Sequence, residues 1–220
     1  MRNRPSASGF NLIEMVIVLA ITGALLAALA PRAFTYLRDA RVTQAQNDAN
    51  RIAEAIGKFL QDTGVPPYKN NTTTTSPKSQ VKISGDFDCL VSDTGNDFTT
   101  TTDETTGDSW TAAGSVNCLA GSATRDTLED HLITNTPGGT ATKAYIATGK
   151  MAWEGPYLPS VPVDPWGNKY LVNVGKLDPS VSKGVWVISA GPDGNLETVA
   201  DASNTSSITA GGDDIIARVR

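Results

Sequence analysis

Residues 10–30 read FNLIEMVIVLAITGALLAALA. The apolar run is interrupted only by Asn11, Glu14, Thr22 and Gly23. An α-helix rises about 1.5 Å per residue and a bilayer core is about 30 Å thick, so this stretch is long enough to cross a membrane as a helix. A secretory signal would have a shorter apolar region followed by a small-residue cleavage site, whereas the small residue here, Gly9, precedes the run. The stretch therefore predicts a membrane anchor.

One acidic residue, Glu14, lies inside this apolar run. A carboxylate in an apolar helix costs several kcal/mol unless it is paired, so such a residue points to a function. No basic side chain within the run can neutralise it. Cleavage after Gly9 would create an amine at Phe10, about one helical turn from Glu14. A neighbouring copy of the chain could then supply the partner.

The sequence GFNLIEM at 9–15, followed by VIVLAI, resembles the class III signal of type IV pilins and type II secretion pseudopilins. Glycine precedes the cut, phenylalanine follows it, and glutamate is the fifth residue after it. Pro31 stands where the family often has proline. The resemblance implies that a prepilin peptidase cuts between Gly9 and Phe10, methylates the new amine and leaves 1–9 as a leader peptide. It also implies that Glu14 pairs with the N-terminus of an adjacent subunit during filament assembly.

The helical pattern continues from Pro31 to about Gln61 with a single apolar face. Apolar side chains recur there at spacings of three and four, at Ala45, Ala49, Ile52, Ile56 and Phe59. Gly64, followed by two prolines, is typical of a helix end. We expect 10–31 to form the transmembrane or filament-core half of a stalk helix, and 32–63 to form an amphipathic half that packs on a sheet.

Residues 64–152 have a different composition, rich in threonine and aspartate. This composition predicts an irregular variable region with short strands and, near 128–133, a short helix. The region contains both cysteines, Cys89 and Cys118. Because an exported head meets an oxidising compartment, we expect a disulfide, and closing a loop of this size should contribute roughly 3–4 kcal/mol. Two buried free thiols are the alternative.

Residues 153–220 regain strand character. Runs of β-branched and aromatic residues at 170–174, 185–188 and 215–219 are separated by turn residues. Asp164-Pro165-Trp166-Gly167 matches a type I turn. We therefore expect an α+β, pilin-like fold, in which a long N-terminal helix packs on a small antiparallel sheet and an extended loop insertion lies between them.

A second resemblance lies in this C-terminal part. GPYL at 155–158 and VDPWGNKY at 163–170 are similar to the "GPYL … DPWGxxY" stretch of the major pseudopilin of type II secretion. With the stalk, the resemblance covers roughly 9–67 and 153–216. The threonine-rich block between these parts is longer than the family's usual connection.

The segments SAGPDG at 189–194 and GDDI at 212–215 fall where that family has its calcium loop. Calcium takes six to eight oxygen ligands from carboxylates, carbonyls and water. The resemblance implies that calcium is held by three carboxylates and by backbone oxygens, at Asp193, Asp213, Asp214, Ala190 and Ser189. On composition alone, these acidic residues would be solvated turns.

The charge and the histidine content argue against other functions. The net charge is −5, and the acidic excess lies after residue 63, so binding of nucleic acid through phosphate contacts is not expected. The single histidine, His131, has no partners for a zinc site or a catalytic triad, and we expect it at the surface or at a helix end. The sequence thus favours a protein that is not an enzyme.

Two functions remain. The first is a structural subunit of a type II secretion pseudopilus. Cut by the prepilin peptidase, it would be drawn from the inner membrane by an assembly platform and stacked helically with other copies and with minor pseudopilins to drive protein export.

The second is a major or minor subunit of a surface-displayed type IV pilus serving adhesion, motility or contact. The enlarged acidic block favours the pilus, whereas the "GPYL … DPWG" stretch and the acidic loop favour the pseudopilus. In both cases the chain would be a single-pass inner-membrane protein with a periplasmic head, and later part of a periplasmic or extracellular filament.

Overall fold

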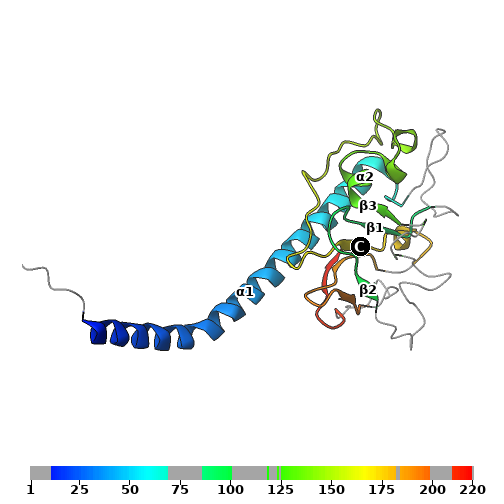
Figure 1. Cartoon of the computed structure of the whole chain (residues 1–220). Coiled ribbons are helices and arrows are strands. Elements are labelled where there is room, and N and C mark those ends of the chain that lie inside the picture. The colour runs from blue at the N-terminus through cyan, green and yellow to red at the C-terminus, as the bar shows by residue number, and fades with distance from the viewer. Residues whose placement is uncertain are drawn as a thin grey trace, which may run out of the picture. The chain divides into compact units, whose positions relative to one another are not determined.

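The computed structural model describes residues 11–68, 86–100, 118, 123, 125–181, 184–198 and 210–219. The predicted processing residues Gly9 and Phe10 lie outside this part. The chain divides into two compact units, residues 1–41 and 42–220. The helices, 3₁₀ turns (η) and strands, in chain order, are α1 Leu12–Thr63, β1 Cys89–Val91, β2 Thr99–Thr100, β3 Arg125–Thr127, α2 Leu128–Leu132, η2 Pro137–Gly139, η3 Ala141–Lys143, β4 Tyr170–Val172, η4 Val174–Leu177, β5 Trp186–Ser189, β6 Asn195–Leu196 and β7 Ile215–Arg218 (Figure 1).

The first half of α1 exposes its apolar side chains. Asn11 stands at its start, where its backbone carbonyl accepts the N–H of Glu14 at 3.0 Å. Between Leu12 and Leu37, the large hydrophobic side chains are exposed by between 48 % at Val18 and 80 % at Leu12. The helix is long and apolar enough to cross a membrane. An apolar surface of this extent is expected to be covered by lipid or by another protein.

The second half of α1 carries the predicted apolar face. All five residues of the pattern are fully buried, namely Ala45, Ala49, Ile52, Ile56 and Phe59. The helix ends where the sequence predicts, because Gly64 takes a left-handed conformation, with φ of 61°, and donates its N–H to the carbonyl of Leu60. The hydroxyl of Thr63 also turns back and donates to the carbonyl of Phe59 at 2.7 Å.

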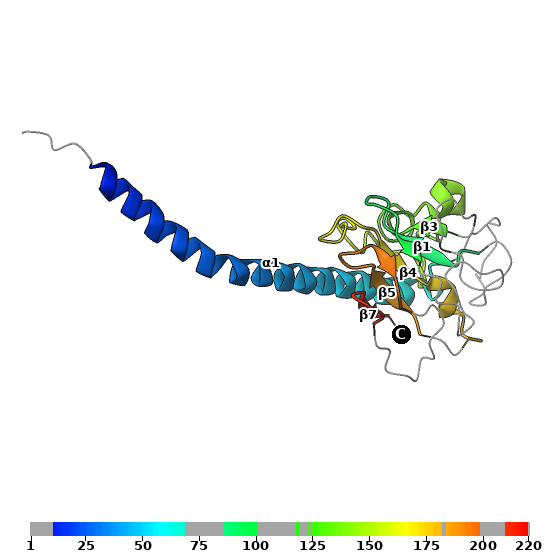
Figure 2. The ribbon, with the colours of Figure 1, turned by 60° about the horizontal axis from the view of Figure 1, so that its bottom comes forward.

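The main sheet has five strands in the order β3-β1-β4-β5-β7, and Figure 2 shows them beside the second half of α1. The three pairs β1–β4, β4–β5 and β5–β7 are antiparallel. The edge pair β1–β3 is parallel, so the sheet is mixed and not antiparallel throughout, as a small antiparallel sheet would be. Parallel neighbours need a long crossover connection, and here residues 92–124 supply it. The α+β class with a long N-terminal helix is confirmed.

The central strands bury both faces of the sheet, as their alternating side chains show. One face packs with α1 in a first hydrophobic cluster, to which the sheet contributes Leu90, Tyr170, Val172, Val187 and Ala217. The other face belongs to a second hydrophobic cluster, to which the sheet contributes Cys89, Val91, Leu171, Trp186 and Ile188. Small antiparallel sheets often leave one face to solvent. Here the second face is apolar, so other parts of the chain must shield it from water.

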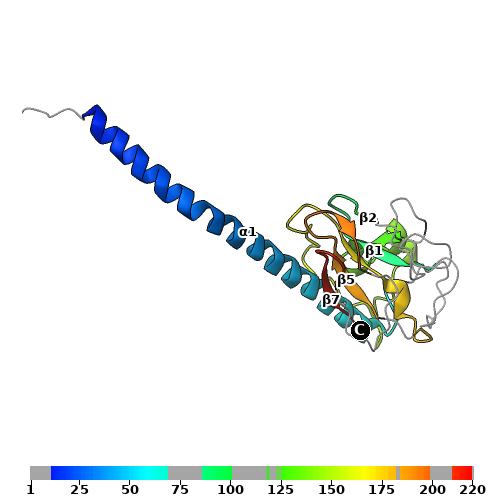
Figure 3. The ribbon, with the colours of Figure 1, turned by 90° about the horizontal axis from the view of Figure 1, so that it is seen from below.

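Two segments of the chain, one before β4 and one after β5, shield that face from water. Phe98 and Cys118 come from the threonine-rich region, and Ala190 and Leu196 come from the chain that follows β5. Cys89 and Cys118 form the expected disulfide, with their Cα atoms 5.5 Å apart, and both are fully buried. Figure 3 shows β2, which belongs to the threonine-rich region, together with β5, β7 and α1.

We predict that Ile188→Ala destabilises the protein by about 2–5 kcal/mol, because truncating a packed core side chain loses burial and leaves a cavity. The matched control is Ile146→Ala, since Ile146 is 41 % exposed and its truncation should cost less than about 0.5 kcal/mol. Thermal unfolding followed by near-UV circular dichroism measures both. Equal, small losses for the two variants would mean that the second hydrophobic cluster is not packed.

Candidate functional site

The DPWG segment forms the turn that the sequence predicts. The N–H of Gly167 donates to the carbonyl of Asp164 at 2.9 Å, and one carboxylate oxygen of Asp164 accepts the N–H groups of Trp166 at 3.0 Å and Asn168 at 2.7 Å. The other carboxylate oxygen accepts the hydroxyl of Ser189 at 2.7 Å. The turn is therefore tied to the end of β5.

The same turn holds the loop that follows β5. Asn168 donates from its amide nitrogen to the carbonyl of Gly191 at 3.0 Å, and Gly191 donates its N–H to the hydroxyl of Ser189 at 3.2 Å. Gly191 has φ of 64°, and a Cβ atom there would lie 2.5 Å from the backbone oxygen of Asp213. Only glycine fits this close approach, which brings the loop after β5 against the turn before β7.

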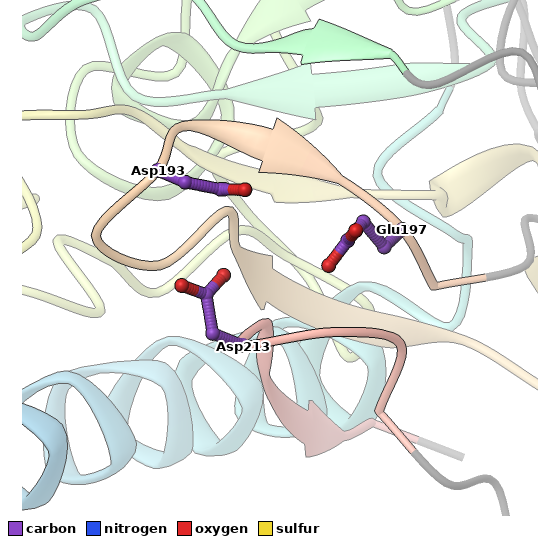
Figure 4. Close-up of side chains that lie close together, drawn as sticks. All are labelled: Asp193, Glu197 and Asp213. Carbon is purple, nitrogen blue, oxygen red and sulfur yellow. The ribbon is translucent and has the colours of Figure 1, made fainter.

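Three carboxylates meet where these two segments approach each other. Asp193, Glu197 and Asp213 each offer an oxygen within 4.8 Å of the others', and Figure 4 shows the three side chains turned toward one another. Asp193 precedes β6, Glu197 follows it, and Asp213 precedes β7. None of the three forms an ion pair with a described lysine or arginine.

The structure thus brings together two of the predicted ligands and adds one that the sequence analysis missed. Glu197 lies four residues after Asp193 in the same loop, and that spacing was the available signal. Ser189 is the last residue of β5 and Ala190 follows it, but the hydroxyl of Ser189 is bonded to Asp164 and Gly191, and Ala190 is fully buried.

Asp214, the remaining predicted ligand, takes a different position. Its Oδ2 accepts the N–H groups of Glu197 at 2.9 Å and Thr198 at 2.6 Å, so it fixes the backbone that carries Glu197. The residue is only 6 % exposed, and its Oδ1 is buried with no hydrogen-bond partner among the described residues.

The crowding of negative charge shifts the acidity of these groups. Burial and the charges of Asp193 and Glu197 raise the pKa of Asp213. Burial also raises the pKa of Asp214, despite the N–H groups that it accepts. In contrast, the backbone and side-chain N–H groups of Asn195 lower the pKa of Asp193. A cation placed among these oxygens would relieve the repulsion.

The donor set suits a hard divalent cation. The cluster offers carboxylate oxygens from a glycine-containing loop, and the adjacent Asp214 has a buried Oδ1 with no hydrogen-bond partner in the described part of the chain. Calcium prefers several oxygen ligands in an adaptable geometry, while zinc prefers histidine and cysteine. The residues present therefore fit calcium.

The single histidine lies elsewhere and is fully buried. His131 is in the last turn of α2, so the helix-end expectation is confirmed and the surface expectation is wrong. Its Nε2 bonds to the carboxylate of Asp126 at 2.8 Å and its Nδ1 to the hydroxyl of Tyr145 at 2.7 Å. Asp126 also accepts the N–H of Gly138 at 2.6 Å. These bonds satisfy the polar atoms and join β3, α2 and the η2 segment.

The fold defines the class of protein: a long N-terminal helix, apolar in its first half, whose second half packs on a small sheet is the pilin-like α+β arrangement. Residues 136–207 match the family model described as type II secretion system (T2SS), protein G. The match confirms the resemblance to the major pseudopilin, and it includes Asp193 and Glu197 but ends before Asp213. No curated protein and no solved structure gave a significant match to the chain.

We predict a pH-dependent contribution from the buried Asp126. Burial alone would raise its pKa, but the bond to His131 and the N–H groups of Gly138 and Thr127 lower the pKa overall. A lowered folded-state pKa means that the stabilisation is present above the unfolded pKa of about 3.9 and is lost as the pH falls through the folded value. Asp126→Asn should cost about 1.5–3 kcal/mol at pH 7, and this difference should shrink below about pH 4.

Thermal unfolding of the wild type and the variant across this pH range measures the difference. Asp93→Asn, which changes an exposed aspartate, is the control and should show little difference at any pH. A gap between the wild type and Asp126→Asn that persists undiminished to the lowest pH would contradict the role of the carboxylate charge.

Proposed function

We propose that this chain is a filament-forming structural subunit of a type II secretion pseudopilus, one that acts mechanically and catalyses no reaction. The observation that carries the proposal is the match to the protein G family over residues 136–207. The apolar first half of α1 supports it, because a subunit stored in a membrane and then stacked in a filament needs such a surface.

In this proposal the first half of α1 has two environments. Before assembly it spans the inner membrane, with the head in the periplasm. After a prepilin peptidase removes residues 1–9, an assembly platform draws the subunit out, and the same apolar side chains pack against other copies and against minor pseudopilins. Growth of the filament would then drive protein export.

Glu14 is the residue proposed to direct this stacking. It stands in the first turn of α1, within the exposed apolar surface. A carboxylate surrounded by apolar side chains is costly unless a cation neutralises it. The methylated amine of Phe10 on an adjacent subunit would supply that cation.

We propose that the head binds calcium. Asp193, Glu197 and Asp213 would hold it, with backbone oxygens near Ala190 as further ligands. The bound ion supplies positive charge that offsets the repulsion among the carboxylates. The loop after β5 and the turn before β7 are already close at Gly191, and the bound ion would hold them together.

The alternative is a subunit of a surface-displayed type IV pilus. The enlarged acidic, threonine-rich region favours it, because a filament displayed outside the cell needs a soluble outer surface. Filaments sheared from the cell surface that contain this chain would support the pilus and count against a pseudopilus confined to the envelope.

We predict that Glu14→Ala is processed normally but assembles poorly. Loss of the carboxylate removes the attraction to the neighbouring N-terminus while leaving the cleavage site intact. Cross-linking of envelope fractions and electron microscopy of overexpressed filaments measure assembly, and intact mass measures the removal of residues 1–9. The control is Glu54→Ala, which changes an exposed glutamate on the same helix. Abundant filaments from Glu14→Ala would contradict the pairing.

We predict that calcium stabilises the full-length chain in detergent, by about 2.7 kcal/mol at a concentration one hundred times the dissociation constant. Asp213→Asn should abolish most of this gain. Without calcium at neutral pH, the same variant should be as stable as the wild type or more stable by less than about 1 kcal/mol, because the raised pKa of Asp213 means that its charge opposes folding.

Thermal unfolding with calcium and with a chelator gives these four values, and Asp93→Asn is the control for removing one negative charge. Equal stabilisation of the wild type and Asp213→Asn by calcium would exclude this cluster as the binding site.

A further inference from the structure

The threonine-rich region reaches the carboxylate cluster through β2. Thr99 and Thr100 pair in parallel with Asn195 and Leu196 of β6. The N–H of Thr99 donates to the carbonyl of Gly194 at 2.9 Å, and its hydroxyl contacts the side-chain oxygen of Asn195. Because β6 is the segment that connects Asp193 to Glu197, its backbone sets how far apart these two carboxylates lie.

β6 makes a second contact with the threonine-rich region through a buried apolar side chain. Leu196 is almost fully buried and belongs to the second hydrophobic cluster together with Phe98, Ala190 and the two cysteines. The disulfide therefore lies in the same packed group as residues of the loop that carries the carboxylates. Loosening one part of a close-packed cluster removes contacts from the others.

Polar contacts hold residues 96–100, the segment that contains β2, in place. Arg125 of β3 forms an ion pair with Asp97, donates to the backbone carbonyl of Cys118 at 3.2 Å, and places its guanidinium 5.7 Å from the centre of the Phe98 ring. On the other side, Asn96 donates its N–H to the carbonyl of Gly167 at 2.8 Å. The segment is thus fixed both to the disulfide and to the DPWG turn.

We propose that residues 96–100 and the Cys89–Cys118 disulfide form a positioning element for the divalent-cation site, so that the oxidised protein binds calcium more tightly than the reduced one. The inference rests on the calcium site of the proposed function. Reduction would release Cys118 from Cys89 and lower the fraction of molecules in which β2 holds β6. The apparent affinity falls with the fraction of molecules that are competent to bind.

Calcium and the disulfide must then influence each other equally. Reduction by glutathione breaks the protein S–S bond. Two glutathione thiols give up two electrons and two protons to the cysteines and join as glutathione disulfide. If oxidation strengthens calcium binding by a given factor, saturating calcium shifts this equilibrium toward the oxidised protein by the same factor. A disulfide that stabilised only a remote part of the head would show no such link.

The experiment uses the full-length chain in detergent. Titration calorimetry gives the calcium dissociation constant of the oxidised and the reduced protein, and we expect reduction to weaken binding on the order of fivefold or more. Glutathione buffers with calcium or with a chelator give the thiol–disulfide equilibrium constant, which should change by the same factor. If the oxidised wild type binds no calcium, the cation site fails and this inference fails with it. If both redox forms bind equally, only this inference is overturned.

If the reduced chain unfolds, a variant that keeps the disulfide tests the same idea. Thr99→Val removes the hydroxyl that contacts β6, and Thr94→Val is the matched control because Thr94 is an exposed threonine of the same region. We expect Thr99→Val to weaken calcium binding about threefold or more while the near-UV spectrum of the calcium-free protein is unchanged. Calcium affinity in Thr99→Val equal to that of Thr94→Val would contradict the proposal.

Discussion

The structure of the head depends on the burial of both faces of two central strands, β4 and β5. Val172 and Val187 pack toward α1, while Leu171 and Ile188 pack in the second hydrophobic cluster. Each apolar face gains stability only if another part of the chain keeps water away, at roughly 25 cal/mol for every Å² covered. The amphipathic half of α1 covers one face. The disulfide-linked threonine-rich region and the loop after β5 cover the other, so neither can be treated as an appendage.

This arrangement explains how a polar, threonine-rich region becomes part of the fold. Its composition provides too few apolar side chains for a core of its own, but it places Phe98 and two half-cystines on a face that the strands have already made apolar. Its strands β1 and β3 also extend the main sheet. The same packing brings β2 alongside β6. The region that covers the second face of the sheet is therefore in direct contact with the strand next to the proposed cation site.

The candidate site shows the limit of reasoning from sequence patterns. Asp193 and Asp213 were found through the family resemblance, and the structure places them together. Glu197 was missed, because its contribution depends on where β6 directs its side chain. Asp214 was assigned with Asp213 since the two are adjacent, yet its Oδ2 is used by the N–H groups of Glu197 and Thr198. Asp213 lies in the turn before β7 and faces Asp193 and Glu197, whereas Asp214 is held by backbone N–H groups, a distinction that sequence adjacency does not reveal.

The sequence by itself determined the local features: the apolar helix with Glu14 inside it, the buried stripe from Ala45 to Phe59, the helix end at Gly64 and the DPWG turn. Each depends on residues within a few positions of one another, where periodicity and backbone preference decide the structure. Tertiary structure alone decided the parallel pairing of β1 with β3, the two-sided burial of the sheet and the meeting of Glu197 with Asp213. These join residues far apart in the chain, and they form only when the packing of both sheet faces outweighs the entropy of closing the long connections between them.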